Sequence, residues 1–528
     1  MRDNMLKIPI LIVVLLIGIL IGTYYKDYFG NNKLDRNSEK IMEVLSYTNK
    51  YYLEDVDSDK LIDAAIKGML ATLDPHTSYI PAIQQEISEE EFRGNFEGIG
   101  IEFQVVNDTI TVVSPITGGP SESLGIQAGD RIIKIDGASS IGFNNQDVIK
   151  SLRGEKGTKV DVVIFRPPSK KEYNFTIERA EIPIFAVDAS FIIGTDVGYI
   201  SVSKFSETTT DEMLKALEKL KNQGMEKLIL DLRNNPGGLL SQAYQVADFF
   251  IHGNKMIVYT EARVSDLSEK YYASRSYPYE NIPLIILVNR GSASGSEIVA
   301  GAVQDWDRGL IVGETTFGKG LVQRPFILSD NSAVRITVSK YFTPSGRAIQ
   351  RNYENGNDQY YQELYNRNLD SIKTVDDSAK TYRTDSGRVV YGGGGITPDH
   401  SVQLCELTDY TAELRRKNIY YLFIRKYLDS EKTNISNKFK NYKDFEANFK
   451  LGKKVSADFI SFAENHGVSY SSKEFEKDKL YIRALLKAYI ARDLWKNDGW
   501  YYVLLQTDKQ FIKAAALFEE AAKLANLN

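Results

Sequence analysis

The chain has 528 residues, more than one hydrophobic core accommodates, so roughly three or four folded units are expected. Hydrophobic residues make up 43% and charged residues 26%, as in ordinary globular proteins. The formal net charge of −5 argues against a general nucleic-acid-binding protein. The only cysteine, Cys405, excludes an intramolecular disulfide and a zinc site built from several cysteines. The four histidines are scattered without metal-ligand spacing, so we expect no metal.

An apolar run, Ile8–Thr23, lies near the N-terminus between a basic start and the aromatic pair Tyr24–Tyr25. Aromatic residues at this place are typical of the belt that flanks a membrane span. The run is short for a spanning helix, which needs about 20 residues. The alternative is a cleaved signal peptide, for which Gly22–Tyr25 is a poor cleavage site. We therefore expect residues 1–28 to be an uncleaved single-pass anchor in the cell (inner) membrane, with the remaining chain on the extracytoplasmic, or periplasmic, side.

Helical spacing of apolar residues marks both ends of the rest of the chain. Residues 29–95 are expected to form helices, with a turn at Asp74–Tyr79 in which His76 caps or packs rather than catalyses. Residues 401–528 carry no apparent chemistry and could brace the core, mediate oligomerisation or bind an adaptor. The helices expected in that C-terminal region include Ala412–Leu428, Phe475–Trp495 and Phe511–Leu524.

Residues 96–180 differ from these ends, because short β-branched runs alternate with glycines. This pattern predicts a small β-rich domain with one helix near Asn144–Leu152. The expected strands are Ile101–Val106, Thr109–Val113, Arg131–Ile135, Val160–Phe165 and Tyr173–Ile177.

Residues 181–400 alternate strands with helices, which indicates an α/β layered core. A polar stretch without periodicity, Tyr353–Arg388, is expected to be an exposed loop. The expected strands are Tyr199–Val202, Leu228–Leu232, Leu284–Val288 and Leu310–Val312, and the expected helices are Asp211–Asn222, Leu240–Phe250 and Ser296–Gln304.

The densest chemical signal follows the strand Leu284–Val288, where the small residues Ser292–Ser296 lead into an apolar helix. Such a turn can expose a serine at a helix N-terminus, where free N–H groups and the helix dipole favour an oxyanion. The logic resembles that of a nucleophile elbow, although the sequence is not G-x-S-x-G. On spacing alone, serines ahead of a helix are usually caps.

Two further segments complete the candidate site. Lys319 lies between two glycines after a buried strand. It can act as a general base only if its pKa falls well below the reference value of about 10.4, which burial can cause. The alternative is a surface lysine in a flexible turn. The strand Leu228–Leu232 also ends in a glycine turn, whose backbone N–H groups could face an oxyanion. Asp231 and Arg233 are expected to pin that turn by an ion pair.

Together these segments resemble the carboxyl-terminal processing, or tail-specific, serine proteases, over residues 65–400. The segments Asp231–Gly238, Ser292–Ile298 and Gly318–Gln323 occur in the family's order. Members of the family place the catalytic lysine 25 residues after the serine, which is the separation of Ser294 and Lys319 in this chain. The same spacing selects against the two neighbouring serines, Ser292 and Ser296.

The resemblance also implies roles for three further residues. Gln323 would orient Lys319, and the backbone N–H groups of Gly238 and Gly295 would form the oxyanion hole. The position of Gly295 is usually alanine in the family, and glycine keeps the N–H while adding local freedom.

The β-rich region resembles a PDZ domain, which the family carries. Pro120–Gly137 matches the PDZ core motif, and Gly98–Phe103 resembles the carboxylate-binding loop and strand. Loop N–H groups can hold a terminal carboxylate while the bound peptide adds a strand to the sheet edge. An ordinary bulge or turn is the alternative for the loop alone. The substrate-binding residues implied are Gly98, Ile99, Gly100 and Ile101.

The fold class implied is multidomain α+β. A crotonase/ClpP-like α/β layered protease core (181–400) would carry an inserted PDZ domain (96–180), helical regions at 29–95 and 401–528, and an N-terminal transmembrane helix (1–28). The function implied is that of a serine endopeptidase working through a Ser-Lys dyad and an acyl-enzyme, without metal or cofactor. Its partners would be protein or peptide C-terminal tails, the membrane, and an adaptor or second copy.

Three other functions fit parts of the pattern. A catalytically silent, membrane-anchored PDZ scaffold would not need Ser294, Lys319 and Gln323 together. A crotonase-like hydratase or thioesterase would share the core but leave the PDZ insertion unexplained. A histidine-dependent serine hydrolase would use His76 or His252, neither of which lies near a matching motif.

Overall fold

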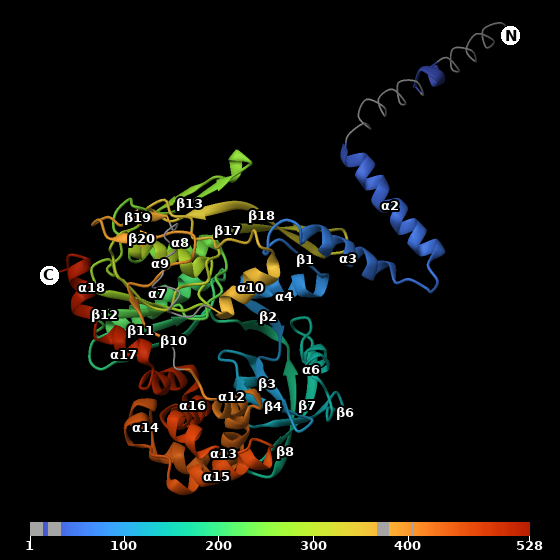
Figure 1. Cartoon of the computed structure of the whole chain (residues 1–528). Coiled ribbons are helices and arrows are strands. Elements are labelled where there is room, and N and C mark those ends of the chain that lie inside the picture. Colours follow the sequence, from blue (N-terminus) through green and yellow to red (C-terminus); the bar gives the residue numbers. More distant parts are fainter. Residues whose placement is uncertain (1–13, 19–32, 367–379, 404–405, 528) are drawn as a thin grey trace. The chain divides into compact units, whose positions relative to one another are not determined.

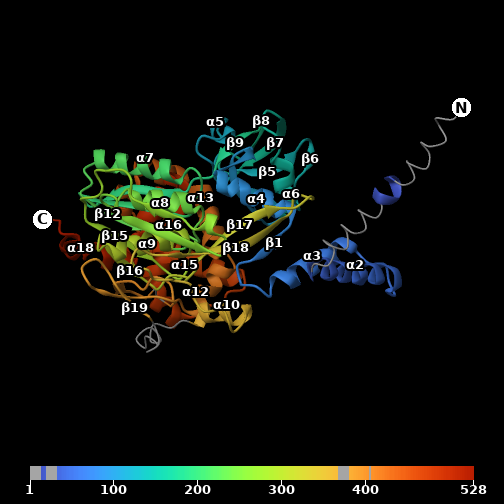
Figure 2. The ribbon, with the colours of Figure 1, turned by 90° about the horizontal axis from the view of Figure 1, so that it is seen from above.

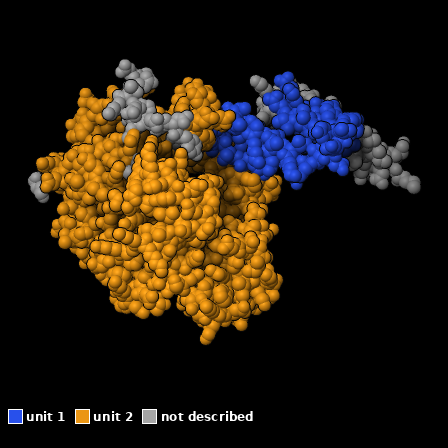
Figure 3. All heavy atoms as spheres, turned by 60° about the horizontal axis from the view of Figure 1, so that its bottom comes forward, with its two compact units in different colours: residues 1–79 blue, residues 80–528 orange. Residues whose placement is uncertain are grey.

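The computed structural model describes residues 14–18, 33–366, 380–403 and 406–527. The chain divides into two compact units, residues 1–79 and residues 80–528 (Figure 3). Most of the predicted anchor, residues 1–13 and 19–28, lies outside the described residues, as does Cys405. Among the described residues, no helix has both the length and the apolar character that a membrane crossing requires.

The first unit contains the helices α2 (Lys33–Tyr51) and α3 (Ser58–Leu70). The Asp57 carboxylate caps α3 by accepting the N–H of Lys60. In the turn that follows, the Asp74 carboxylate accepts the backbone N–H groups of His76 at 2.9 Å and Thr77 at 3.0 Å. The helices and the turn predicted for this region are confirmed.

The second unit begins with β1 (Ser78–Ile80, shared with the first unit) and α4 (Ala82–Arg93), followed by an antiparallel sheet of order β3-β4-β5-β7-β8. A capping box at Asn144 and Asp147 starts its helix α6. The five predicted strands and the helix are confirmed to within two residues at each end. The elements are β2 (Asn95–Gly98), β3 (Ile101–Val106), β4 (Thr109–Pro115), α5 (Pro120–Ser123), β5 (Arg131–Ile135), β6 (Ala138–Ser139), α6 (Asn145–Leu152), β7 (Lys159–Arg166), β8 (Lys171–Glu178) and β9 (Ala180–Pro183).

The α/β core is built on a sheet of order β10-β11-β12-β15-β16-β21, in which β10 is antiparallel to β11 and the other neighbours are parallel. Every residue of β15 is buried, because both faces of the sheet are covered. The strands are β10 (Val187–Ile193), β11 (Val197–Val202), β12 (Lys227–Asp231), β15 (Leu284–Val288), β16 (Leu310–Gly313) and β21 (His400–Ser401).

Different parts of the chain cover the two faces of this sheet (Figures 1 and 2). The helices α7 (Thr209–Asn222), α8 (Leu240–Asp248) and α9 (Gly295–Asp305) pack on one face. The C-terminal helices α17 (Lys509–Ala515) and α18 (Phe518–Leu524) pack on the other. The single helix predicted over Phe511–Leu524 is therefore wrong. The chain turns at Leu517, and both short helices keep a phenylalanine against the sheet.

A second, antiparallel sheet joins β13 (Met256–Ala262), β14 (Lys270–Tyr272), β17 (Leu321–Ile327) and β18 (Ala333–Phe342), and a 3-10 helix spans Ser265–Leu267. The exposed loop predicted over Tyr353–Arg388 is wrong in part. The segment contains α10 (Asn357–Asn366) and β19 (Thr381–Arg383), which pairs with β20 (Val389–Tyr391). Tyr360 anchors α10 because its buried ring stacks on the Arg351 guanidinium at 4.0 Å. Residues 367–379 lie outside the described residues.

The C-terminal helical region has its own apolar core and contacts the β-rich domain (Figure 1). One predicted helix, Ala412–Leu428, is wrong in its continuity, because Asn418 adopts φ 55° and separates two helices. The helices are α12 (Asp409–Arg416), α13 (Ile419–Lys438), α14 (Tyr442–Asn448), α15 (Lys453–Asn465) and α16 (Ser472–Leu505), which kinks at Trp495 and Lys496.

Two side chains of α16 bind the β-rich domain beside this kink. Arg492 donates to Glu102 at 2.7 Å, and Lys496 donates to Glu122 at 2.5 Å. The C-terminal region therefore braces both the α/β core and the β-rich domain.

Candidate active site

Ser294 lies in a sharp turn between the buried strand β15 and the helix α9. Its φ of 50° and ψ of −109° are unusual for a residue with a side chain, and such strain is often found at functional sites. The neighbouring serines have structural contacts, since Ser292 donates to the Leu232 carbonyl at 2.7 Å and Ser296 to the Asn235 carbonyl at 2.9 Å. Both neighbours are fully buried, whereas Ser294 is only partly buried. Of the three candidates, Ser294 is the accessible one.

A single buried carboxylate joins two segments of the site. One is the turn that carries Ser294, residues 289–294 (the serine turn), and the other is the loop that carries Lys319, residues 314–320 (the lysine loop). One oxygen of Glu297, Oε2, accepts the backbone N–H groups of Ser294 at 2.8 Å and Lys319 at 2.9 Å. The other oxygen accepts the hydroxyl of Thr316 at 2.5 Å and the N–H of Gly318 at 2.6 Å. Glu297 therefore sets the spacing between the backbones of Ser294 and Lys319, although they are 25 residues apart.

The pKa of Glu297 reflects two opposed effects. Complete burial is the larger effect, because desolvation disfavours the charged form, and the resulting pKa of Glu297 is about 7, raised from 4.5. The four hydrogen bonds to its oxygens lower it in part. The ionised form satisfies all four donors, whereas the protonated form must give up acceptor capacity.

Tyr341, on β18, ties the same two residues together through their carbonyl groups. Its hydroxyl lies 2.7 Å from the Lys319 carbonyl oxygen and 3.1 Å from that of Ser294. Burial raises the pKa of Tyr341 well above its usual range, so the hydroxyl keeps its proton and donates. The backbones of the candidate nucleophile and base are therefore held on both their N–H and C=O sides.

The glycine turn after β12 lies directly against Ser294. A Cβ atom on Gly237 would lie 2.7 Å from the Ser294 Cβ and 2.8 Å from the Gly295 nitrogen. Gly238 has φ 148°, and a Cβ there would lie 2.1 Å from the Phe205 carbonyl oxygen. Among the hydrogen bonds of the described residues, neither Gly238 N–H nor Gly295 N–H has an acceptor. The oxyanion-hole role of Gly238 and Gly295 stays a prediction.

The ion pair predicted to pin this turn is confirmed. The Arg233 guanidinium contacts the Asp231 carboxylate at 2.6 Å, and Tyr199 donates its hydroxyl to the same carboxylate at 2.7 Å. The turn continues with Asn234, which exchanges hydrogen bonds of 2.9 Å with the side chain of Asn289. Asn289 follows β15, so the glycine turn after β12 and the turn that carries Ser294 are bonded to each other.

Gln323 lies on β17, four residues beyond Lys319. Its side-chain nitrogen donates to the Thr337 hydroxyl at 3.3 Å across the β17–β18 pair. This contact fixes the Gln323 side chain on β17, the strand that follows the lysine loop. The orienting role of Gln323 toward Lys319 stays a prediction.

The four residues predicted to bind a terminal carboxylate run from the end of β2 to the start of β3. Gly98 ends β2 and pairs with Ala180, and the Ile99 side chain is buried in the core of the β-rich domain. Gly100 has φ 73°, and a Cβ there would lie 3.3 Å from the Gly119 Cα. Ile101 begins β3, which in the described part of the chain pairs with β4 alone within its sheet. β3 is therefore an edge strand that an added peptide strand could extend.

Among the described residues, no group of three or more His, Cys, Asp or Glu side chains could hold a metal ion. His252 is exposed and pairs with Glu280 at 2.7 Å, outside the segments that carry Ser294 and Lys319.

Comparisons with known proteins cover most of the chain. Residues 196–357 match peptidase family S41, and residues 111–166 match the PDZ domain family. Residues 25–82 match the activating protease CtpB N-terminal domain, and residues 410–496 match a family of unknown function, DUF8443.

The carboxy-terminal processing protease CtpB of Bacillus subtilis is 35% identical over 325 residues, which are 61% of this chain and 67% of that protein. The carboxy-terminal-processing protease of Bartonella bacilliformis is 38% identical over 312 residues, 58% of this chain and 71% of that protein. The chain belongs to the carboxy-terminal processing proteases of peptidase family S41. A solved structure of the photosystem II D1 C-terminal processing protease is 31% identical and covers 58% of this protease and 89% of that chain, with a TM-score of 0.33.

The sequence alone missed several residues that organise the site of this protease. Glu297 lies within the quoted serine motif, but nothing local shows that its carboxylate reaches the lysine loop. Tyr341 gave no signal, because a tyrosine in a strand usually indicates packing. Asp508 and Gln510, which bind Arg233, lie in a region where no chemistry was apparent.

Proposed function

We propose that this protease is a serine endopeptidase that binds C-terminal tails at its PDZ domain and cleaves peptide bonds with a Ser294–Lys319 dyad. The observation that carries the proposal is the buried Glu297 carboxylate, which accepts the N–H groups of both Ser294 and Lys319. The accessible position of Ser294, at a strained turn before a helix, supports its role as the nucleophile.

In the proposed mechanism, neutral Lys319 removes the proton of the Ser294 hydroxyl, and Ser294 attacks the scissile carbonyl. The N–H groups of Gly238 and Gly295 stabilise the oxyanion, which is worth about 10²–10³ in rate per donor. Lys319 then protonates the leaving amine, and an acyl-enzyme forms. Lys319 next activates the water that hydrolyses the acyl-enzyme. Gln323 keeps Lys319 aligned through both steps.

Tail recognition is proposed at the edge of the PDZ sheet. The turn around Gly100 and the outer edge of β3 offer backbone groups to a peptide and its terminal carboxylate. An amidated tail would lose the charge that these N–H groups recognise. We also propose that tail binding gates the protease, which activation by a separate, uncleavable C-terminal peptide would support and purely competitive inhibition would contradict.

The test is degradation of a folded reporter with an apolar C-terminal tail by the full-length chain. Ser294→Ala, Lys319→Ala and Lys319→Arg should each abolish turnover, the last because a guanidinium stays charged. Exposed positions on α13 supply the controls, Ser430→Ala and Lys426→Ala, which should keep full activity. Retained turnover in any of the three dyad variants would refute the dyad.

The same experiment separates the protease from a scaffold. Cleavage that requires both Ser294 and a free tail carboxylate establishes the nucleophile and the tail recognition together. Tight tail binding without cleavage by the parent protein would instead favour the catalytically silent PDZ scaffold.

We also propose that residues 1–28 anchor the chain in the cell membrane with the protease outside the cytoplasm. The support is the apolar run Ile8–Thr23, which follows a basic start. The full-length chain should remain in the membrane fraction after alkaline extraction, and a chain lacking residues 1–28 should not. Recovery of both in the soluble fraction would contradict the anchor.

A further inference from the structure

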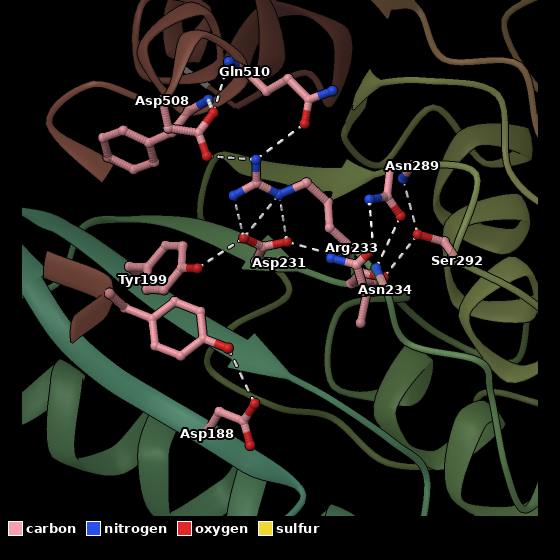
Figure 4. A network of polar contacts seen from close by, with 12 residues as sticks. Asp188, Tyr199, Asp231, Arg233, Asn234, Asn289, Ser292, Asp508 and Gln510 are labelled. Carbon is pink, nitrogen blue, oxygen red and sulfur yellow. Dashed lines mark hydrogen bonds and ion pairs between the residues drawn. The ribbon is translucent and has the colours of Figure 1, made fainter. Parts of the chain in front are cut away.

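The guanidinium of Arg233 is held by residues from two distant parts of the chain (Figure 4). Its Nε and one terminal nitrogen donate to Asp231, at 2.9 Å and 2.6 Å. The other terminal nitrogen donates to Asp508 at 2.6 Å and to Gln510 at 3.0 Å. Asp508 lies 275 residues away in sequence.

These contacts are shielded from water. The Arg233 side chain is 12% exposed, Asp508 is 19% exposed, and Gln510 is fully buried. Charged hydrogen bonds in such surroundings are stronger than on the surface, and loss of one partner leaves the other without water to replace it. Arg233 is therefore held more firmly than a surface arginine.

Arg233 also begins the turn that contributes to the oxyanion hole. The next residue, Asn234, is bonded to Asn289 on the serine side and has φ 58°. Gly238 follows four residues later. The turn is thus held by Asn289 on one side and by Arg233 on the other (Figure 4).

Asp508 has two separate tasks, one for each oxygen. Oδ1 caps α17 by accepting the N–H groups of Gln510 at 2.9 Å and Phe511 at 3.1 Å. Oδ2 accepts from Arg233. Gln510 also donates to the Val402 carbonyl at 2.8 Å, and the Phe511 ring packs edge-on against Tyr199 of β11. The support for Arg233 is therefore fixed to the core sheet.

We propose that Asp508 and Gln510 are positioning residues for the peptidase reaction, because they hold Arg233 and thereby the turn that carries Gly238. This inference rests on the function proposed above. The family descriptions that match the chain end at residue 357 for peptidase S41 and at residue 496 for DUF8443, so neither includes these two residues. The C-terminal segment thus contributes to catalysis as well as to stability.

The test removes the contact of Asp508 with Arg233 while keeping its cap of α17. In Asp508→Asn the α17 cap is kept, because asparagine caps helices as well as aspartate does. The amide presents either a neutral oxygen or N–H groups to Arg233, so the ion pair is lost. We expect kcat for the tailed substrate to fall about 10- to 100-fold, part of the 10²–10³ that one oxyanion donor supplies, with KM changed less than about twofold.

A second variant and a substitution that keeps the charge distinguish loss of positioning from misfolding. Asp508→Ser also keeps a good helix cap, but it is smaller and leaves space beside Arg233. It should give the same loss of kcat. Asp508→Glu, which keeps the charge, should recover part of kcat. The matched control is Asp57→Asn, since Asp57 caps α3 and pairs with the exposed Lys60, and its kcat should not change.

Amide hydrogen exchange in residues 232–240 provides a readout that does not depend on activity. It should rise in Asp508→Asn and Asp508→Ser but not in Asp57→Asn, and loss of the shielded ion pair should also lower the unfolding temperature of the two Asp508 variants. Unchanged kcat in both variants of an active parent, or unchanged exchange, would overturn the positioning role. If the parent itself shows no Ser294-dependent cleavage but exchange rises, the proposed function fails, whereas the support of the turn by Asp508 stands.

Discussion

Replacement of Glu297 by glutamine keeps the size of the side chain but removes one of its two acceptor oxygens. In the parent, Oε2 accepts from Ser294 and Lys319, and Oε1 accepts from Thr316 and Gly318. An amide presents N–H groups where one oxygen stood. If the amide nitrogen replaces Oε2, the N–H groups of Ser294 and Lys319 face a donor; if it replaces Oε1, only the N–H of Gly318 does, because the Thr316 hydroxyl can also accept.

Two opposed terms set the effect on stability. Loss of one or two hydrogen bonds to a charged acceptor costs about 1.5–6 kcal/mol, at about 1.5–3 kcal/mol each. Against this, the variant avoids burying a charge. The rise of the Glu297 pKa from 4.5 to about 7 corresponds to about 3 kcal/mol in the free energy of the ionised form. At pH 8 we therefore expect the unfolding free energy of the variant to lie within about 3 kcal/mol of that of the parent.

The two proteins should differ in how their stability depends on pH. Because the pKa of Glu297 is higher in the folded state, its contribution is fully present below pH 4.5 and is lost as the pH rises to about 7. Glutamine does not titrate. The unfolding free energy of Glu297→Gln relative to the parent should therefore rise by about 3 kcal/mol between pH 4.5 and pH 7.

Catalysis should respond more strongly than stability, because the backbone next to the dyad loses an acceptor in either orientation: at Ser294 and Lys319 in one, and at Gly318, beside Lys319, in the other. At pH 8 we expect kcat/KM of Glu297→Gln to fall at least about 10²-fold, as small misplacement of reacting groups costs that much. In the parent, activity should decline below about pH 7, as Glu297 takes up a proton.

The assay is urea unfolding of parent and variant from pH 4.5 to pH 8, together with kcat/KM on a tailed peptide. Glu43→Gln, at an exposed position of α2, is the control for the change of charge. The reasoning is refuted if the stability difference is independent of pH. It is also refuted if kcat/KM of the variant at pH 8 lies within twofold of the parent.

Three other substitutions test the geometry around the dyad. Tyr341→Phe removes the hydroxyl that bridges two carbonyl oxygens, and should lower kcat about tenfold and stability by about 1 kcal/mol, measured by kinetics and urea unfolding. Gly238→Ala should abolish activity and lower the unfolding temperature, because the new Cβ would lie 2.1 Å from the Phe205 carbonyl oxygen at a backbone φ of 148°. Gly295→Ala should lower the free energy of unfolding by only about 1–3 kcal/mol, because its new Cβ would meet the Phe205 ring at 2.9 Å while the backbone at this position is not left-handed. Equal effects of the two glycine substitutions would contradict this ranking.

The sequence by itself determined the elements that depend on local patterns. Strand β15 was found at its observed bounds, Leu284–Val288, because burial of both its faces leaves an uninterrupted apolar run. The strands of the PDZ domain were found because glycine turns separate them. Helix continuity was less predictable, since the break at Leu517 follows the surface of the sheet beneath it and has no glycine or proline to mark it.

The sequence also determined the candidates Ser294 and Lys319, because their motif spacing is a property of the chain alone. Only the tertiary structure decided what holds them. Glu297, Tyr341 and Asp508 reach residues that are 22, 47 and 275 positions away, respectively. A hydrogen bond depends on where two groups meet in space, and packing of the sheets and helices brings these groups together without leaving a periodic or local signal in the sequence.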